Sequence, residues 1–505
     1  MKTLRQLLDG IPCSWNGKGE LNTPIAYVRS DSRQIKPGDL FVAITGLHLD
    51  GHQFIKEAIR RGAKVVVSER FDRAASDLEI PQFNVSKSRT ALSQLVACAY
   101  DFPARKLKCI GITGTNGKTT TAFLVQYLLN EVTRAGLVGS IYYDDGEIKQ
   151  VAGNTTPTPE VLNEILSRMV ANNISYCVME ISSHALDQDR IQGFEFSSAI
   201  FTNLTQDHLD YHHDYETYYQ AKRKLFFGSI PPQHSIINRD TTFGARLIGE
   251  IKETSRVVSY GFDPPRDYLA EEVQLGWKGL DFILVRDKNR FKVHAPLMLR
   301  HNVYNVLAAL STISEEGFSL NELIPNLVHF QGVAGRMEPI DEGQDFRVFV
   351  DFAHTPDGLF NVLSSLEGLK RNRVISVFGC GGDRDQAKRP MMGGIANQLS
   401  DVVILTSDNP RSERPEDILD HIRSGIHQNG KKTQLFVRPD RKEAIRYAIE
   451  LAETEDVVFI FGKGHEHYQI LGKEKIPFSD QQIARHWLKV RCSHLRKSQK
   501  LAVEG

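Results

Sequence analysis

Residues 110–129 read IGITGTNGKTTTAFLVQYLL, and this stretch decides the fold around it. An apolar strand pattern is followed by a glycine-rich turn and then by a helix pattern. Gly114 and Gly117 allow main-chain N–H groups to point into one concavity, and the helix directs its positive end to the same place. Lys118 can reach outer phosphates, and Thr119 can offer its hydroxyl to Mg²⁺. The stretch therefore predicts a loop that binds a nucleoside triphosphate.

This loop is a short variant of the usual phosphate-binding loop. The strict pattern G-x-x-x-x-G-K-[ST] fails because Ile112 stands five positions before Gly117, where a glycine is required. The alternative is an ordinary helix N-terminus with turn glycines. We favour phosphate binding because strand, glycines, Lys-Thr and helix occur together in the required order. The loop alone does not decide what is done with the phosphate.

Strand and helix patterns on both sides of this loop predict an α/β protein. KCIGIT, SYCVMEIS and SSAIFTNL alternate with helical stretches, as a parallel sheet requires. Before them, DLFVAI, HQFIKEAIRRG and AKVVVSE read as strand, helix and strand, and after them come the four short strands RVFVD, RVISVFG, DVVILTS and DVVFIFG. A chain of 505 residues at ~100–200 residues per domain indicates three domains. We place them at residues 1–102, 103–333 and 334–505.

The composition of the chain limits the kinds of molecule that it is expected to bind. The 62 basic and 62 acidic residues give no net charge, so the chain has no general attraction for nucleic acid or anionic membranes. The six cysteines form no CxxC pair, which argues against a disulfide framework and a zinc module. No apolar run approaches the ~20 residues of a bilayer span. We expect a cytoplasmic monomer that binds small molecules.

Polar residues at two further strand ends suggest metal ligands. Glu180 ends an apolar strand in SYCVMEISSHAL, and Asp207, His208 and Asp210 follow another in AIFTNLTQDHLDYH. Brought to the same sheet edge as Thr119, they would form a mostly oxygen site suited to Mg²⁺. The alternatives are that Glu180 is a helix-cap partner and that His208 is a surface histidine. The following helix carries Lys222 and Lys224, and such a charged helix is usually only a solvated face.

Eleven ordered motifs resemble those of the Mur ligases. They are TGTNGKTT, NTTPTP, MEISSHALDQDRI, TNLTQDHLDYH, YYQAKRKLF, HNVYNVLAA, GRME, DFAHTPD, FGCGGDRDQAKRP, SDNPR and FGKGHE, and they span about residues 30–479. The resemblance is strongest to the branch that adds the third residue of the peptidoglycan stem peptide. It implies an ATP-dependent amide ligase that adds meso-2,6-diaminopimelate to UDP-N-acetylmuramoyl-L-alanyl-D-glutamate through an acyl phosphate. It also implies a UDP-sugar-binding N-terminal domain, a central P-loop ATPase-like domain and a C-terminal Rossmann-like domain for the amino acid.

The resemblance assigns the nucleotide and metal residues. One magnesium ion corresponds to Thr119 and Glu180, and a second to His208 with a carbamylated Lys222; Lys224 is the nearby alternative. Lys118, Glu180, His208 and Lys222 are the implied catalytic residues. The implied ATP-binding residues are Gly114, Thr115, Asn116, Gly117, Lys118, Thr119, Thr120, Asn302, Asn305, Arg336 and Asp351. For one of the two asparagines the alternative is a helix cap, and His354 is expected only to support its loop.

The resemblance also assigns the substrate residues. They are Ser30, Asn154, Thr155, Thr156, Ser183 and Arg190 for the UDP-sugar dipeptide, and Arg384, Asp408, Asn409, Pro410, Arg411, Gly462 and Glu466 for the amine. Threonine and serine hydroxyls could equally cap strand ends. A guanidinium at Arg411 would match the second carboxylate of diaminopimelate in a two-pronged way. Its alternative is a surface pair with Glu413 or Glu416.

Two other functions are compatible with part of the pattern. A folate polyglutamate synthetase would share the phosphate loop and the Lys222 region, but has no reason to keep the DNPR loop or the N-terminal unit. A non-catalytic nucleotide switch would need only the phosphate loop. Neither explains all eleven motifs.

Overall fold

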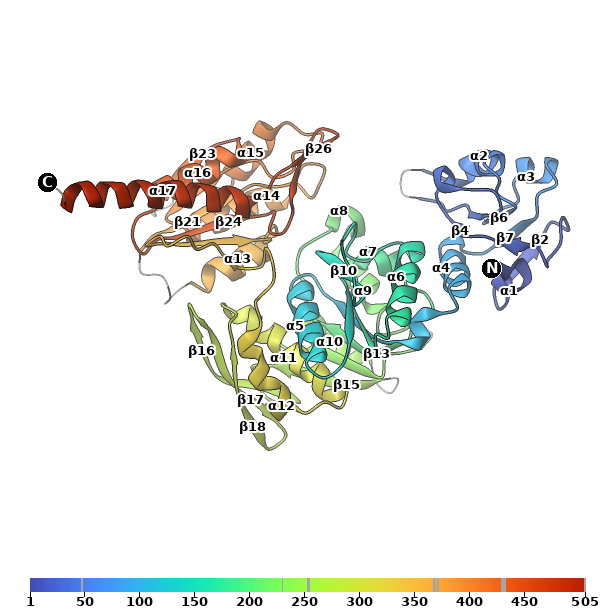
Figure 1. Cartoon of the computed structure of the whole chain (residues 1–505), viewed down its shortest axis with the longest axis horizontal. Helices are drawn as coiled ribbons and strands as arrows, with labels where there is room; N and C mark the ends of the chain where they lie inside the picture. The colour runs from blue at the N-terminus through green and yellow to red at the C-terminus, as the bar shows by residue number, and fades with distance from the viewer. Residues whose placement is uncertain are drawn as a thin grey trace.

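The computed structural model describes residues 1–503 except 47–48, 229, 252–254, 367–368, 370–371 and 428–432. Three bodies follow one another along the chain, each built on its own β-sheet (Figure 1). Within the described ranges, no helix is both long and apolar enough to cross a membrane.

The N-terminal body contains a five-stranded sheet. Its order is β2 (Cys13–Trp15), β7 (Gln82–Val85), β6 (Val65–Ser68), β5 (Leu40–Val42) and β4 (Val28–Arg29). All neighbours are parallel except β2 and β7. The helices are α1 (Leu4–Leu8), α2 (Ile55–Arg60), α3 (Arg73–Asp77) and α4 (Ser88–Ala99), and β1 (Lys2–Thr3) pairs with β3 (Pro24–Ile25). The predicted strand, helix and strand correspond to β5, α2 and β6.

The central body is an eleven-stranded sheet. Its order is β11 (Lys149–Val151), β10 (Tyr142–Asp144), β9 (Ala135–Val138), β12 (Tyr176–Glu180), β8 (Lys108–Thr113), β13 (Phe196–Phe201), β14 (His234–Asn238), β15 (Arg256–Gly261), β16 (Tyr268–Gly276), β17 (Gly279–Arg286) and β18 (Asn289–Ala295). In this order, the seven strands from β9 through β12, β8, β13, β14 and β15 to β16 are parallel. The strands at both edges, β10 and β11 on one side and β17 and β18 on the other, pair antiparallel. The parallel sheet expected from the sequence therefore forms the centre of a larger sheet whose edges add antiparallel pairs. Along β18, buried and exposed side chains alternate, which is typical of antiparallel strands with one solvated face.

Helices cover both faces of the parallel part. They are α5 (Lys118–Asn130), α6 (Pro159–Ala171), α7 (Ser183–Asp187), α8 (Leu209–His212), α9 (Tyr215–Arg223), α10 (Thr242–Glu250), α11 (Arg300–Glu315) and α12 (Leu320–Leu323). One apolar core contains α5 and α11, and the other contains α6, α9 and α10. Burial on both faces explains why these strands are almost continuously apolar.

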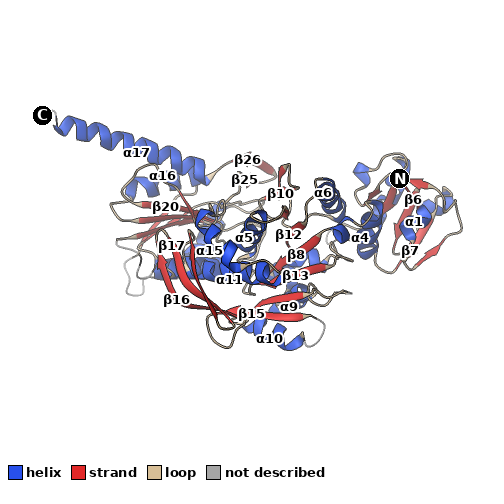
Figure 2. Cartoon of the chain, turned by 60° about the horizontal axis from the view of Figure 1, so that its bottom comes forward, coloured by secondary structure: helices blue, strands red, loops and turns tan. Residues whose placement is uncertain are grey.

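The C-terminal body is a six-stranded sheet. Its order is β19 (Glu338–Pro339), β20 (Arg347–Asp351), β24 (Val457–Phe461), β21 (Val374–Phe378), β22 (Val402–Leu405) and β23 (Gln434–Val437), and all neighbours but the first pair are parallel. Around it lie α13 (Pro356–Ser364), α14 (Lys388–Leu399), α15 (Pro415–Arg423), α16 (Arg441–Leu451) and α17 (Asp480–Val503), as Figure 1 shows. The same body contains the hairpin of β25 (Tyr468–Leu471) and β26 (Glu474–Pro477), which is labelled in Figure 2. The four predicted strands are β20, β21, β22 and β24. Their carboxyl ends carry the loops in which ligands of open α/β sheets bind.

Candidate active site

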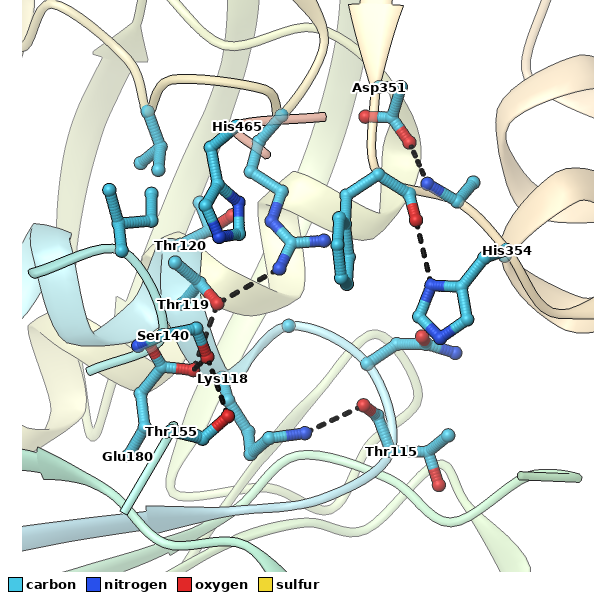
Figure 3. Close-up of a pocket in the computed structure, with 18 of the residues that line it drawn as sticks. Thr115, Lys118, Thr119, Thr120, Ser140, Thr155, Glu180, Asp351, His354 and His465 are labelled. Atoms are coloured by element: carbon cyan, nitrogen blue, oxygen red, sulfur yellow. Dashed lines mark hydrogen bonds between the residues drawn. The ribbon is translucent and has the colours of Figure 1, made fainter. Parts of the chain in front are cut away.

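A cavity of about 880 Å³ lies where strand ends of the central and C-terminal sheets face each other. Figure 3 shows part of it, with the phosphate loop below and the loops after β20 and β24 above. The predicted residues that line it are Thr115, Asn116, Gly117, Lys118, Thr119, Thr120, Asn154, Thr155, Glu180, His208, Asn302, Asn305, Arg336, Asp351, Arg384, Arg411 and Glu466. The structure thus brings residues from two domains around one space.

The phosphate loop requires its two glycines. Gly114 has a φ of +149°, and a Cβ there would lie 1.9 Å from Thr202 Oγ1. Gly117 has a φ of +87°, and a Cβ there would meet Asn305 Oδ1 at 2.5 Å. Lys118 Nζ donates 2.8 Å hydrogen bonds to the carbonyl oxygens of Gly114 and Thr115, so its ammonium lies on the loop. Burial lowers the pKa of Lys118.

Thr119 is the meeting point of three structural elements. Its hydroxyl donates to Glu180 Oε2 at 2.9 Å and accepts from Arg336 Nη2 of the C-terminal domain at 3.1 Å. Glu180 is fully buried and also accepts from the backbone N–H and hydroxyl of Ser140. Within the described part of the chain, no three His, Cys, Asp or Glu side chains form a metal cluster. A hydroxyl and a carboxylate in contact still form the hard oxygen pair that suits Mg²⁺ beside phosphates.

His208 and Lys222 lie on the other side of the loop. His208 immediately precedes α8 in a left-handed conformation with a φ of +56°, and its Nε2 lies 3.4 Å from Asp207 Oδ2. Desolvation lowers the pKa of His208 to about 3, although Asp207 opposes this shift. Lys222 is 1% exposed and donates to the Gly114 carbonyl at 2.8 Å. Burial, with the charge of Lys118, lowers its pKa well below the ordinary value.

Lys224 has a different environment. Its ammonium lies 3.2 Å from Asp187 Oδ1, and about half of its side chain is exposed. Of the two lysines on this segment, Lys222 alone reaches the phosphate loop through a hydrogen bond within the described residues.

Asn302 and Asn305 lie inside α11 and not at its cap. The cap position is Leu299, so the alternative of an asparagine-capped helix is wrong. Asn305 donates to Asn302 Oδ1 at 2.8 Å and accepts from the Thr121 hydroxyl at 3.3 Å. Both asparagines are buried and line the cavity, and Asn305 packs against Gly117 of the phosphate loop.

Arg336 and Asp351 form the C-terminal side of the nucleotide region. Arg336 stacks on Phe352, with its guanidinium carbon 4.3 Å from the ring centre. Asp351 accepts from the backbone N–H groups of Met337 and Ala353, and burial raises its pKa. His354 Nδ1 hydrogen-bonds to the Phe352 carbonyl oxygen, which is the loop-supporting contact expected for it.

The loops after β22 and β24 form the amine side. Arg411 lines the cavity, and its Nη1 donates to the Gly382 carbonyl oxygen at 2.7 Å. The alternative of a surface pair with Glu413 is wrong, because Glu413 forms a two-pronged pair with the buried Arg389. Burial and the charge of the exposed Arg384 lower the pKa of Arg411. Two cations thus face the same end of the cavity.

Four of the other residues predicted for the amine do not line the cavity but pack against the residues that do; they are Asp408, Asn409, Pro410 and Gly462. Asn409 donates to Glu466 Oε2 at 3.0 Å, and a Cβ at Gly462 would lie 2.5 Å from Asp408 Oδ2. Pro410 is buried, with its carbonyl oxygen packed against Gly382. The loops are therefore packed too closely to accept larger residues at these glycines.

The residues assigned to the UDP-sugar dipeptide extend from the cavity toward the N-terminal body. Thr155 accepts from the Ser140 hydroxyl at 3.1 Å, and Arg190 donates to the Thr156 carbonyl at 2.6 Å. The Ser183 hydroxyl lies 2.9 Å from His212 Nε2. The Thr156 hydroxyl does cap a strand end, because it donates to the Glu180 carbonyl oxygen at the end of β12 and accepts from the Ser182 backbone N–H. Asn154 binds the Tyr143 hydroxyl through its backbone.

Ser30 lies apart from this cavity. Its hydroxyl donates to Glu160 Oε1 of the central body at 2.6 Å, and its backbone N–H does so at 3.2 Å. Of the predicted dipeptide residues, Asn154 and Thr155 line the cavity, whereas Thr156, Ser183 and Arg190 do not. Ser30 lies at a separate contact between the N-terminal and central bodies.

Sequence reasoning missed several residues that hold the site together. Asn116 Nδ2 donates to Asp357 Oδ2 at 2.7 Å, which links the phosphate loop to α13, and its backbone N–H donates to Asn203 Oδ1. Lys463 is fully buried beside Asn409 and Glu466. Asn203, Asp357 and Lys463 stand inside the quoted motifs TNLT, DFAHTPD and GKGHE, so the motifs marked the right loops but not these side chains.

Comparisons with known proteins agree with this arrangement. Three family models match in order: the Mur ligase family catalytic domain over residues 24–100, the Mur ligase middle domain over 112–313 and the Mur ligase glutamate ligase domain over 335–464. A UDP-N-acetylmuramoyl-L-alanyl-D-glutamate--2,6-diaminopimelate ligase from Clostridium tetani is 42% identical over 92% of this chain and 95% of its own.

Solved structures give the same result. One of a UDP-N-acetylmuramoyl-L-alanyl-D-glutamate--2,6-diaminopimelate ligase has a TM-score of 0.67 and 30% identity over 97% of this chain and 99% of its own. A MurF ligase from Thermotoga maritima in complex with ADP has a TM-score of 0.62 over 93% of this chain and 99% of its own; at 17% identity it indicates a shared fold alone. The resemblance and the α/β fold expected from the sequence are confirmed. The chain belongs to the Mur ligase family.

Proposed function

We propose that this Mur ligase uses ATP to join UDP-N-acetylmuramoyl-L-alanyl-D-glutamate to meso-2,6-diaminopimelate in peptidoglycan biosynthesis. The substrate carboxylate takes the γ-phosphoryl group of ATP, and the amine then displaces phosphate from the acyl phosphate. The observation that carries this proposal is the single cavity lined by both the phosphate loop and the amine-side residues Arg384, Arg411 and Glu466. The Clostridium tetani relative is named for the same two substrates.

Each domain has a separate task in this proposal. Residues 1–102 bind the UDP-sugar end, residues 103–333 bind ATP, and residues 334–505 bind the amino acid. Ser30 lies at the contact between the first two, where its hydroxyl is held by Glu160. We further propose that the protein acts as a cytoplasmic monomer, which size-exclusion chromatography with light scattering tests directly.

The phosphate loop supports ATP binding and transfer. The ADP in the Thermotoga maritima relative supports a nucleotide in this fold. Lys118 holds its ammonium on the loop through two carbonyl oxygens, from where a side-chain rotation brings it to the transferred phosphoryl group. Arg336 enters from the other domain and lies next to Thr119. Cations positioned around developing negative charge lower the barrier for phosphoryl transfer.

The oxygen atoms of Thr119 and Glu180 fit a magnesium ion. They lie 2.9 Å apart, and the Glu180 carboxylate is fully buried beside the phosphate loop. Magnesium ions at this site and beside His208, when bound, neutralise phosphate charge. The lowered pKa of His208 keeps its imidazole neutral, and the neutral ring is the form that binds a metal ion.

Lys222 fits the proposed carbamate. Carbamylation requires a neutral amine that attacks CO₂, and burial lowers the pKa of Lys222 well below its ordinary value. The resulting anionic oxygen would lie near Lys118 and the phosphate loop, where an anion is favoured. Lys224 lacks this environment because Asp187 holds it as an exposed ion pair.

The acceptor and amine meet between these groups. We propose that Asn154, Thr155, Thr156, Ser183 and Arg190 hold the dipeptide end of the UDP-sugar. Arg411 and Arg384 would bind the distal carboxylate of diaminopimelate. Asp408, Asn409, Gly462 and Glu466 would surround the ammonium group on the same distal carbon, with Pro410 fixing the turn. Holding the distal end in this way leaves the other amine to react with the acyl phosphate.

The test is a coupled assay with the purified chain. ATP, Mg²⁺, the UDP-sugar dipeptide and meso-diaminopimelate should release phosphate and form the tripeptide, seen by mass spectrometry, only when all are present. Slow phosphate release that ignores both substrates would support a nucleotide switch instead. Glutamate addition to a folate would support the folate polyglutamate alternative.

A further inference from the structure

Lys463 is a buried charged residue for which the proposed mechanism has no use. It follows β24 in the GKGHE motif and is 0% exposed. Gly462 and Gly464 on either side have positive φ values of 112° and 51°. This backbone path, which larger residues adopt at a cost, turns the lysine inward.

The close acceptors around the Lys463 ammonium all belong to the amine site. It donates to Asn409 Oδ1 at 3.1 Å and to Glu466 Oε2 at 2.9 Å, and it lies 3.9 Å from Asp408 Oδ1. A lysine ammonium offers three donors and no acceptor. Lys463 therefore joins the loop after β22 to the loop after β24.

These hydrogen bonds fix the orientation of the Asn409 amide. Its Oδ1 accepts from both Lys463 and the backbone N–H of Ile470, so its Nδ2 faces Glu466 and donates to Oε2 at 3.0 Å. Lys463 adds a charged donor to the amide orientation that the Ile470 N–H and the Glu466 carboxylate already favour. The lysine thus holds the Asn409 oxygen and the Glu466 carboxylate together at one point.

The two oxygen atoms of the Glu466 carboxylate have different hydrogen-bond partners. Oε2 accepts hydrogen bonds from both Lys463 and Asn409. Among the described residues, the partner of Oε1 is the Tyr468 hydroxyl at the long distance of 3.5 Å. Because Glu466 lines the cavity and Lys463 does not, Oε1 is the oxygen that remains for a ligand cation.

We propose that Lys463 is a positioning residue for the amine substrate. It holds Asn409 and Glu466 so that Glu466 Oε1 accepts from the ammonium group of the incoming diamino acid. Lys463 itself does not touch the substrate. This inference rests on the proposed function, since it names the residue that prepares the amine pocket of that reaction.

Steady-state kinetics of Lys463→Met test this role. We expect the KM for meso-diaminopimelate to rise by about 30-fold or more, while kcat at saturation changes by less than about threefold. The KM values for ATP and the UDP-sugar dipeptide should stay within about twofold. Lys442→Met, at an exposed lysine on α16, is the matched control and should leave all values unchanged. An unchanged KM for the amine, or an equal rise for all three substrates, would overturn the proposal.

The double variant Lys463→Met/Glu466→Gln separates positioning from general destabilisation, because it leaves no unpaired carboxylate at Glu466. If Lys463 acts through Glu466, the double variant should have the amine KM of Glu466→Gln alone, even if the single lysine variant fails to fold. A further rise of more than about fivefold would contradict the inference. If the parent chain couples no diaminopimelate, the proposed function fails; if it does and the lysine variant behaves as the parent, only this inference fails.

Discussion

Replacing Arg411 by alanine should remove most of the preference for diaminopimelate over L-lysine. The two amines differ by one carboxylate on the distal carbon. Arg411 lines the cavity with its guanidinium anchored on the Gly382 carbonyl oxygen, and the described residues include no carboxylate paired with it. Burial and the nearby charge of Arg384 lower its pKa, and the negative charge of an anionic ligand here would offset both effects.

The size of the effect follows from the hydrogen bonds that an alanine side chain cannot make to the distal carboxylate. Hydrogen bonds to a charged group contribute about 1.5–3 kcal/mol, which corresponds to roughly 10- to 150-fold in kcat/KM. Because Arg411 is only half-buried, we expect Arg411→Ala to lower kcat/KM for meso-diaminopimelate by about 30- to 100-fold. For L-lysine, which has no carboxylate at that position, the change should be less than about threefold. The parent enzyme should favour diaminopimelate by about 100-fold or more.

Phosphate release measured with each amine over a range of concentrations checks these values. Arg411→Lys keeps the charge without the planar fork and should recover only part of the loss. Arg423→Ala, at an exposed arginine on α15 of the same domain, is the control. Comparable kcat/KM values for the two amines in the parent enzyme would refute the reasoning, as would an Arg411→Ala variant with the original preference.

Three further predictions concern the phosphate loop, the buried lysine and pH. Lys118→Ala should abolish ligation through the loss of several kcal/mol of transition-state stabilisation, and ligase activity within about tenfold of the parent would contradict this. Lys222→Ala should be nearly inactive and partly rescued by short carboxylic acids, whereas Lys224→Ala should remain active; the reverse pattern would mean that the modified lysine is Lys224. Burial lowers the pKa of His212 to about 4, below the ~6.5 of an unfolded histidine, so the unfolded state binds more protons between these values and stability should fall as pH drops from about 6.5 to 4. Scanning calorimetry should show a shallower fall in Tm for His212→Gln, and an unchanged slope would count against this assignment.

The sequence predicts those parts of the fold and of the site that leave a local pattern in the chain. Strands such as β8, β12 and β22 are buried on both faces, so their apolar runs are visible without a structure. The antiparallel strands β16 to β18 expose alternate residues and therefore resemble surface segments. Gly114, Gly117 and Thr119 could be identified because a phosphate loop fixes their spacing in the chain.

Other interactions depend on distant segments and leave no local pattern. Asn116 meets Asp357, 241 positions away, and Lys463 meets Asn409, 54 positions away. A lysine in a glycine-rich loop is ordinarily solvent-exposed, and only the folded backbone shows that Lys463 is buried. The alternative pairing of Arg411 with Glu413 could be rejected only from the structure, in which Glu413 forms its ion pair with Arg389.

The pair formed by Arg389 and Glu413 determines how the amine specificity of this enzyme can be engineered. Arg389 lies in the first turn of α14 and its side chain is fully buried. Both of its terminal nitrogens donate at 2.8 Å to Glu413, which stands two positions after Arg411 in the sequence. Glu413 also accepts from the backbone N–H of Asp383, in the loop that carries Arg384. A loop transplanted from a lysine-adding relative without a carboxylate at position 413 would leave the guanidinium unpaired, at a cost of about 3 kcal/mol or more. Residues 408–411 are therefore not an interchangeable cassette, and a graft should extend through position 413.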